Sequence, residues 1–387
     1  MSVEFYWRLP LHGCHGSLSK DANRGDWGPL APGRIAPGLR DGVHDGSTYL
    51  DHTAEIARAA ENAGFFGALV ISFPNTEEAW ITSAQLARQT KSLTFMVAFQ
   101  PNFIHPVYAA RQAATLQRLS QGRLAWNVIT GGGGPGQRWY GDFLPHDDRY
   151  TRTREFLEVI TAEFEGKPYN YKGKIFQVEN GGLPHPFSAE KKPKIFLAGS
   201  SDSAIDVAVH QSEFLLNWLE PVDAIKDNIR RAQDKSAAIG RDLKYAIRVD
   251  VVARPTEAEA WREIARAWDA RVTPEIIAAA RAQWGATESV GAARQRAFNP
   301  ESKGRWEDLK LPGNRWAGFH FLRGGPPVGL VGSYQQVAEQ LNDLIDLGVG
   351  SLVPAGTPHL EEAYRVGEEI LPLLRQNQSA ARLAAAE

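Results

Sequence analysis

The fold is decided by a strand–helix–strand unit at residues 194–218, which read KIFLAGSSDSAIDVAVHQSEFLLNW. A short apolar run turns at a glycine and two serines, continues with a helical pattern of apolar residues, and ends in a second apolar run. This order predicts two neighbouring parallel strands joined by a crossover helix. Continuous apolar runs are typical of strands that are buried on both faces.

The same alternation continues along the whole chain of 387 residues. Eight runs have the composition of buried strands: 4–9, 67–72, 94–99, 123–129, 194–199, 213–218, 243–253 and 351–356. Eight strands that are each followed by a helix are the number in a closed (β/α)8 barrel, a TIM barrel, and an open doubly wound sheet usually has fewer. We therefore predict the α/β class and one barrel domain over residues 1–387.

Several helix boundaries have capping signals. Thr256 with Glu259, and Ser333 with Gln336, have the spacing of a capping box ahead of apolar residues at helical intervals. Thr357 and Pro358 resemble the N-cap and the first residue of the last helix.

Two stretches interrupt the alternation. Residues 11–46 follow the first strand and are rich in Gly, Pro, His and Asp. Residues 273–331 begin helically and become polar and rich in Gly and Pro before strand eight. Loops of this length in compact domains often act as lids. In a barrel, the loops after the strands form the active-site face.

Composition excludes several classes of protein. The chain has 43 basic and 45 acidic residues and a formal net charge of −2, and it has no basic stripe, so we do not expect nucleic-acid binding. No apolar run approaches the length of a membrane span, and the N-terminus does not resemble a secretory signal. Cys14 is the single cysteine, which excludes an internal disulfide and fits a cytoplasmic protein. The 11 Trp residues either pack in the core or line a pocket for a flat ring.

Other motifs in the sequence do not support a dinucleotide-binding, metal or serine-hydrolase site. The run 131–136 formally matches G-x-G-x-x-G, but Pro135 and the residues after it do not begin a helix cleanly, so a loop at a strand end fits better than a dinucleotide fingerprint. His12, Cys14 and His15 lack a second ligand cluster, and we expect no metal site. There is no G-x-S-x-G elbow for a serine hydrolase.

Two places have the chemistry of an anion site. Gly199, Ser200 and Ser201 lie between a strand and a helix, where backbone N–H groups and the helix dipole attract anions, although Ser201 could serve only as a helix cap. Arg248 lies within an apolar strand and points the same way as Asp250. This arginine either forms a structural pair with Asp250 or binds an anionic substrate group.

Several segments resemble the two-component, reduced-flavin-dependent alkanesulfonate monooxygenases of the bacterial luciferase-like superfamily. In family order, and over nearly the whole chain, they are 109–116 (AARQAATL) with Arg118-Leu119-Ser120; Asn127 through Gly131; His146 with Arg149-Tyr150; 199–202 (GSSD); Trp316-Ala317-Gly318 with Arg323-Gly324-Gly325; and 358–368 (PHLEEAYRVGE). The last segment is the most specific.

The resemblance implies a barrel with a mobile insertion before strand eight. It also implies reduced FMN from a separate NAD(P)H-dependent FMN reductase, and O2 as co-substrate. The cofactor-binding residues would be Thr76, Asn127, His146, Arg149, Tyr150, Gly199, Ser200 and Ser201, with the serines at the FMN phosphate. The active-site residues would be His12, Trp218, Arg248, Arg323 and His359. Arg323 would close over the substrate from the insertion, and His359, in a first helical turn, is expected to be neutral.

Three positions depart from the family pattern. The family usually has Cys where this chain has Thr76, His where it has Asp250, and Tyr where it has Thr357. Thr76 retains a hydroxyl that can hydrogen-bond to oxygenated flavin. Asp250 either holds Arg248 in place or accepts hydrogen bonds from a hydroxylated substrate.

These observations lead to the hypothesis of a monooxygenase that cleaves the C–S bond of an organosulfonate to give an aldehyde and sulfite. The long first loop, Asp250 and the tryptophans suit a polar or sugar sulfonate. Three alternatives stay open: oxygenation of a sulfone or another neutral molecule, an F420-dependent dehydrogenase on the same barrel, and a non-catalytic flavin-binding partner. We expect a homodimer or a homotetramer.

Overall fold

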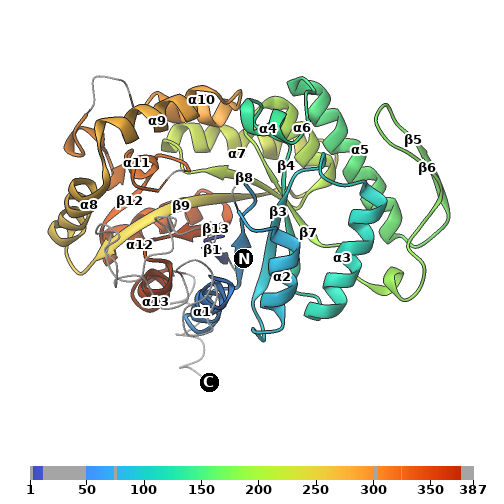
Figure 1. Cartoon of the computed structure of the whole chain (residues 1–387), viewed down its shortest axis with the longest axis horizontal. Helices are drawn as coiled ribbons and strands as arrows, with labels where there is room; N and C mark the ends of the chain where they lie inside the picture. Colours follow the sequence, from blue (N-terminus) through green and yellow to red (C-terminus); the bar gives the residue numbers. More distant parts are fainter. Residues whose placement is uncertain (1–2, 12–48, 74–75, 300–303, 324, 376–387) are drawn as a thin grey trace.

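Eight parallel strands close into a barrel in the computed structural model, which describes residues 3–11, 49–73, 76–299, 304–323 and 325–375 (Figure 1). The order around the barrel is β9-β13-β1-β2-β3-β4-β7-β8, and β8 pairs again with β9. The strands are β1 (Glu4–Leu9), β2 (Gly67–Val70), β3 (Thr94–Phe99), β4 (Leu124–Ile129), β7 (Lys194–Ala198), β8 (Phe214–Trp218), β9 (Lys244–Arg254) and β13 (Val349–Ala355). The predicted (β/α)8 barrel is confirmed, and each of the eight predicted runs forms one of its strands.

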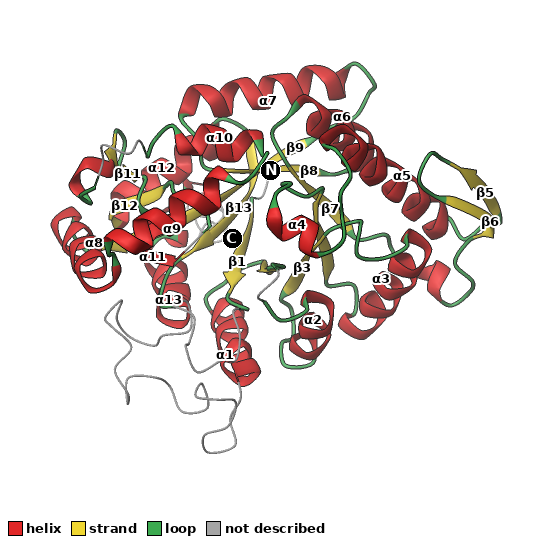
Figure 2. Ribbon diagram, turned by 45° about the horizontal axis from the view of Figure 1, so that its top comes forward, coloured by secondary structure: helices red, strands yellow, loops and turns green. Residues whose placement is uncertain are grey.

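Helices cover the outside of this sheet (Figures 1 and 2). They are α1 (Tyr49–Asn62), α2 (Ala79–Ala87), α3 (Pro106–Ser120), α5 (His146–Phe164), α6 (Asp202–Gln211), α7 (Val222–Ala237), α12 (Tyr334–Asp346) and α13 (His359–Glu369), with η4 (Leu371–Leu373) after the last. The hairpin of β5 (Tyr169–Lys172) and β6 (Gln177–Gly181) projects from the side of the barrel, and η2 (Phe187–Ala189) leads into β7. Both predicted capping boxes are present, at Thr256 with Glu259 and at Ser333 with Gln336.

Two predictions about where helices begin were wrong. Helix α13 begins at His359 with Pro358 as its N-cap residue, so Thr357 lies one position outside the cap. A short helix, α4 (Pro135–Trp139), does begin at Pro135, with Gly134 as its N-cap. Proline at a first helical position lacks only an N–H that no intrahelical acceptor would use, which explains why the glycine run leads into a helix.

The predicted insertion, residues 273–331, lies between β9 and β13. From the end of β9 to the start of α12, the chain forms α8 (Glu257–Arg271), α9 (Pro274–Gly285), α10 (Val290–Arg296), η3 (Glu307–Leu309), β10 (Lys310–Leu311), β11 (Arg315–Trp316), α11 (Phe319–Arg323) and β12 (Gly329–Ser333). On one edge, the long strand β9 pairs with two different strands, one along each half of its length. Its first half pairs with β8, and its second half, from Asp250 to Arg254, pairs in parallel with β12. The insertion is thereby hydrogen-bonded to the carboxyl end of the seventh barrel strand.

Three tryptophans of the described residues are fully buried, and each of them packs in a hydrophobic core. Trp7 and Trp126 belong to the main core, and Trp316 belongs to a second core that the insertion forms with α8 and the end of β9. Trp218 and Trp284 differ, because they are partly exposed and face each other with ring centroids 5.4 Å apart. Within the described ranges, no helix is long and apolar enough to cross a membrane.

Candidate active site

Two arginines converge on one carboxylate at the carboxyl end of β9. Arg248 and Arg323 both contact Oδ2 of Asp250, and Asp250 is only 1% exposed. Arg248 and Asp250 share a face of the strand because side chains alternate, whereas Arg323 comes from α11 of the insertion. Gly329 of β12 lies against Asp250, where an added Cβ would be 2.8 Å from the Asp250 Cβ. Asp250 therefore links the insertion to the barrel wall.

A third arginine lies near the last predicted catalytic residue. Nη1 of Arg8 on β1 is 3.3 Å from Nε2 of His359, and both side chains are buried. A guanidinium can only donate, so this ring nitrogen of His359 must accept and the hydrogen of the neutral ring is on Nδ1. Sequence analysis missed Arg8. Its signal was the same as that of Arg248, a cation in an apolar strand.

The residues predicted for the FMN phosphate lie together at the start of α6. The hydroxyl of Ser201 caps this helix by accepting from the N–H of Ala204 at 3.2 Å. Oγ of Ser200 is buried and has no hydrogen-bond partner. Gly199, with φ +153°, leaves no room for a side chain, because a Cβ would lie 3.0 Å from the Tyr150 hydroxyl. Gly199, Ser200, Ser201 and Tyr150 are therefore brought together, as expected for an anion site at a helix N-terminus.

The other predicted cofactor residues are more dispersed. Oδ1 of Asn127, inside the barrel, is buried without a hydrogen-bond partner. His146 lies beside Tyr150, with ring centroids 5.0 Å apart, and hydrogen-bonds to Asp147 at 2.8 Å. The Thr76 hydroxyl is engaged in a local turn, since it donates to the carbonyl of Phe73 at 3.0 Å.

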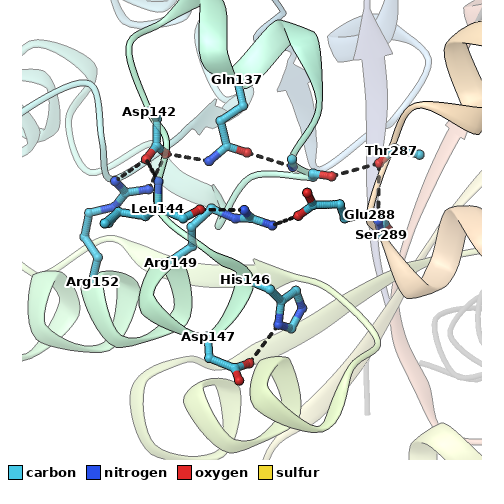
Figure 3. A network of polar contacts seen from close by, with 12 residues as sticks. Gln137, Asp142, Leu144, His146, Asp147, Arg149, Arg152, Thr287, Glu288 and Ser289 are labelled. Atoms are coloured by element: carbon cyan, nitrogen blue, oxygen red, sulfur yellow. Dashed lines mark hydrogen bonds and ion pairs between the residues drawn. The ribbon is translucent and has the colours of Figure 1, made fainter.

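The linker between α9 and α10 is docked on the glycine-rich loop after β4 (Figure 3). The N–H of Glu288 and the hydroxyl of Thr287 donate to the carbonyl of Gly132 at 2.8 and 3.0 Å. The Glu288 carboxylate accepts from Arg149 at 2.9 Å. A Cβ on Gly133, whose φ is +70°, would lie 2.5 Å from that carboxylate. A glycine is therefore needed where the insertion meets the predicted cofactor residue Arg149.

A buried ion pair between Arg152 and Asp142 supports the glycine-rich loop after β4 (Figure 3). Asp142 accepts two hydrogen bonds from Arg152, at 3.0 and 2.6 Å, and one from the amide of Gln137 at 2.5 Å. Gln137 in turn accepts from the N–H of Gly133 at 2.8 Å. Burial raises the pKa of Asp142, but the hydrogen bonds from Arg152 and Gln137 outweigh it, so the pKa lies below its ordinary value. Sequence analysis missed this network, because it depends on contacts that no local pattern encodes.

Trp218 lies at the junction of these groups. It pairs in register with Arg248 on β9, and Gly291 of α10 packs over it and over Ser200, since a Cβ there would be 3.5 Å and 3.4 Å from them. His12 lies outside the described residues. Among the residues that the structure places, no cluster of three or more His, Cys, Asp or Glu could hold a metal.

Comparison with known proteins shows the family. The family model described as luciferase-like monooxygenase matches residues 29–351. Three solved structures with similar folds are a riboflavin lyase with modified FMN and riboflavin (19% identity, 98% of this chain and 92% of that chain, TM-score 0.74), the EDTA monooxygenase from Chelativorans sp. BNC1 (20% identity, 98% and 95%, TM-score 0.69), and an F420-dependent secondary alcohol dehydrogenase (14% identity, 97% and 100%, TM-score 0.65). Each of these likenesses shows the barrel fold alone. The family match covers most of the chain, and the chain therefore belongs to the luciferase-like monooxygenase family.

Proposed function

We propose that this chain is an FMNH2- and O2-dependent monooxygenase that cleaves the C–S bond of an organosulfonate. The convergence of Arg248 and Arg323 on one buried position carries the proposal. A sulfonate has a negative charge and three acceptor oxygens, which two guanidinium groups can bind in a bidentate way. In the reaction, the carbon is oxidised to an aldehyde and sulfite leaves. One atom of O2 enters the aldehyde and the other enters water, with the electrons supplied by reduced FMN.

The residues at the start of α6 suit the FMN phosphate. Ser200 has a buried hydroxyl without a partner, and Gly199 lets the backbone come close to Ala204 and to the Tyr150 hydroxyl, where a side chain would collide. A phosphate is also stabilised by the N–H groups and the dipole of a ten-residue helix. Thr76, Asn127, His146, Arg149 and Tyr150 complete the set of residues that we propose for the cofactor. We propose an NAD(P)H-dependent FMN reductase as the partner that supplies reduced FMN, as the resemblance to the two-component monooxygenases implies.

The remaining residues position the substrate. A sulfonate that binds Arg248 and Arg323 takes over part of the interaction that each makes with Asp250. Trp218 forms a wall between the arginines and the phosphate site, and α11 carries Arg323 over the mouth, where it excludes water. His359 lies beside Arg8 and accepts from its guanidinium at Nε2, which fixes the orientation of the ring at the mouth of the barrel.

Sulfite release tests this function directly. Purified protein with FMN, NADH, a flavin reductase, air and a panel of sulfonates is expected to release sulfite above the reductase-only control. Arg248→Met should reduce kcat/KM by at least a hundredfold, since a charged hydrogen-bonded group is lost at the anion. Release of no sulfite from any sulfonate would contradict the proposal. Oxygenation of sulfones, or tight F420 binding, would then identify which alternative holds.

The phosphate site is tested by a pair of serine variants. Ser200→Ala should weaken FMN binding about tenfold and leave the free energy of unfolding nearly unchanged, because the Ser200 hydroxyl has no hydrogen bond to lose. Ser333→Ala, which removes the N-cap of α12 and is not among the predicted cofactor residues, is the matched control: it should cost about 1 kcal/mol of stability and leave FMN binding unchanged. FMN affinity is measured by fluorescence titration and stability by urea unfolding. Equal FMN binding by the wild type and Ser200→Ala would rule out this phosphate position.

A further inference from the structure

A cavity of about 190 Å³ lies within the insertion, next to the candidate active site. It is lined by Arg281, Trp284, Gln295, Arg296, Asn299, His320 and Pro327, which come from α9, α10, α11 and the segments beside them. Trp284 faces Trp218 at the end of β8, with ring centroids 5.4 Å apart. His320 lies one turn before Arg323 on α11. The cavity is therefore adjacent to the arginines that we assign to the sulfonate.

Two of the residues that line the cavity have side-chain carbonyl oxygens without a hydrogen-bond partner. The amide nitrogen of Gln295 donates to the carbonyl of Leu219 at 2.7 Å, and that of Asn299 donates to the carbonyl of Ala317 at 2.7 Å. A carbonyl can only accept, so these contacts fix which end of each amide is the nitrogen. Oε1 of Gln295 and Oδ1 of Asn299 are both buried without a hydrogen bond. The cavity thus requires hydrogen-bond donors from whatever occupies it.

His320 adds a third polar atom without a partner. The side chain is 5% exposed, and its Nδ1 has no hydrogen bond. Burial, followed by the charges of Arg323 and Arg281, lowers the pKa of His320 to about 3. The imidazole is therefore neutral at physiological pH and has one donor and one acceptor. Leaving such buried groups unpaired is unfavourable, so water or a ligand is expected here.

The mixture of polar groups restricts the class of occupant. Unpaired carbonyl oxygens disfavour an anion, and the guanidinium groups of Arg281 and Arg296 disfavour a cation. An apolar group would leave Gln295, Asn299 and His320 unsatisfied. Hydroxyl groups donate and accept at once, and the indole of Trp284 offers an apolar face for the C–H groups between them.

We infer that this cavity is a subsite for the polyhydroxylated part of the substrate, so that the substrate is a sugar-like sulfonate rather than a simple alkanesulfonate. The inference rests on the proposed function, because the sulfonate is placed at Arg248 and Arg323. The hydroxyl groups enter the cavity beyond Trp218, donate to Gln295 and Asn299, and bond to His320.

Calorimetric titration of the full-length protein with oxidised FMN tests the subsite without any turnover. The probes are a 6-deoxy-6-sulfohexose, 1-hexanesulfonate and D-glucose. The sulfohexose should bind at least tenfold more tightly than hexanesulfonate. His320→Phe and Trp284→Leu should weaken sulfohexose binding about five- to tenfold and change hexanesulfonate binding less than twofold. The matched controls are His210→Phe on α6 and Trp261→Leu on α8, neither of which lines the cavity, and both should bind like the wild type.

The outcomes distinguish a failure of the subsite inference from a failure of the proposed sulfonate function. If hexanesulfonate binds and the sulfohexose is not preferred, or if both cavity variants keep the preference, the inference is wrong and the sulfonate function is unaffected. If no sulfonate binds, the proposed function fails, and D-glucose then tests the cavity alone. Millimolar glucose binding that is lost in His320→Phe would support the subsite, and no glucose binding by the wild type would show that the cavity holds only water.

Discussion

Asp250→Asn is expected to lower the free energy of unfolding by about 3–5 kcal/mol, because it removes one partner of a buried ion pair and leaves the other charges buried. Asp250 is 1% exposed and contacts both Arg248 and Arg323. An asparagine keeps the shape and one acceptor oxygen. The loss in stability therefore reports the charge rather than a cavity.

An anion should restore part of this loss. A sulfonate between Arg248 and Arg323 supplies the negative charge that Asp250→Asn has removed, and at ten times its Kd it adds about 1.4 kcal/mol. The stabilisation by sulfonate should be larger in the variant than in the wild type, since Asp250 no longer competes for the guanidinium groups. Urea unfolding with and without 1-hexanesulfonate measures both effects.

Asp346→Asn is the matched control. Asp346 pairs with Arg375, but both side chains are more than half exposed, so its replacement should cost less than about 1 kcal/mol and respond to sulfonate as the wild type does. A loss below 1 kcal/mol in Asp250→Asn would show that Asp250 is not required to balance the arginines. A large loss that sulfonate does not reduce would argue against an anion site at this position.

The fold could be predicted from the sequence because its signals are local. A strand such as 94–99 is apolar along its whole length, and its neighbours are parallel, so each strand is recognised without knowledge of the others. Capping boxes span four residues and were predicted for the same reason. The start of α13 was misplaced, with Thr357 as its N-cap, because a proline can either occupy the first helical turn or precede it.

The candidate site could be predicted only in part. Ser200, Ser201, Arg248 and His359 lie directly after or within strands, where position in the chain implies position at the mouth of the barrel. Contacts that the insertion makes depend on how α9, α10 and α11 pack against one another and against the barrel, which no local sequence pattern encodes. The pairing of Arg323 with Asp250 and the cavity at His320 could not be foreseen for that reason.

Asp142→Asn should have the second large effect on stability, again about 3–5 kcal/mol, because Arg152 then lies buried with a neutral partner. The consequence extends to the insertion. Asp142 orients Gln137, and Gln137 holds the N–H of Gly133 in the loop on which Glu288 is docked. Cleavage by a protease within residues 286–289 should therefore become faster in the variant, as measured by mass spectrometry of the fragments.

The dependence on pH has a definite sign. The pKa of Asp142 is lower in the folded protein than its unfolded value of about 3.9, so its ionised form stabilises the fold above that pH, and this contribution is lost as the pH falls through the folded pKa. The difference in unfolding free energy between the wild type and Asp142→Asn should be full at pH 7 and shrink below about pH 4. Asp148→Asn, on α5 and paired with the exposed Lys174, should cost less than about 1 kcal/mol at either pH. A difference for Asp142→Asn that stays constant down to pH 3 would mean that the shape of the side chain, and not its charge, supports the loop beneath the insertion.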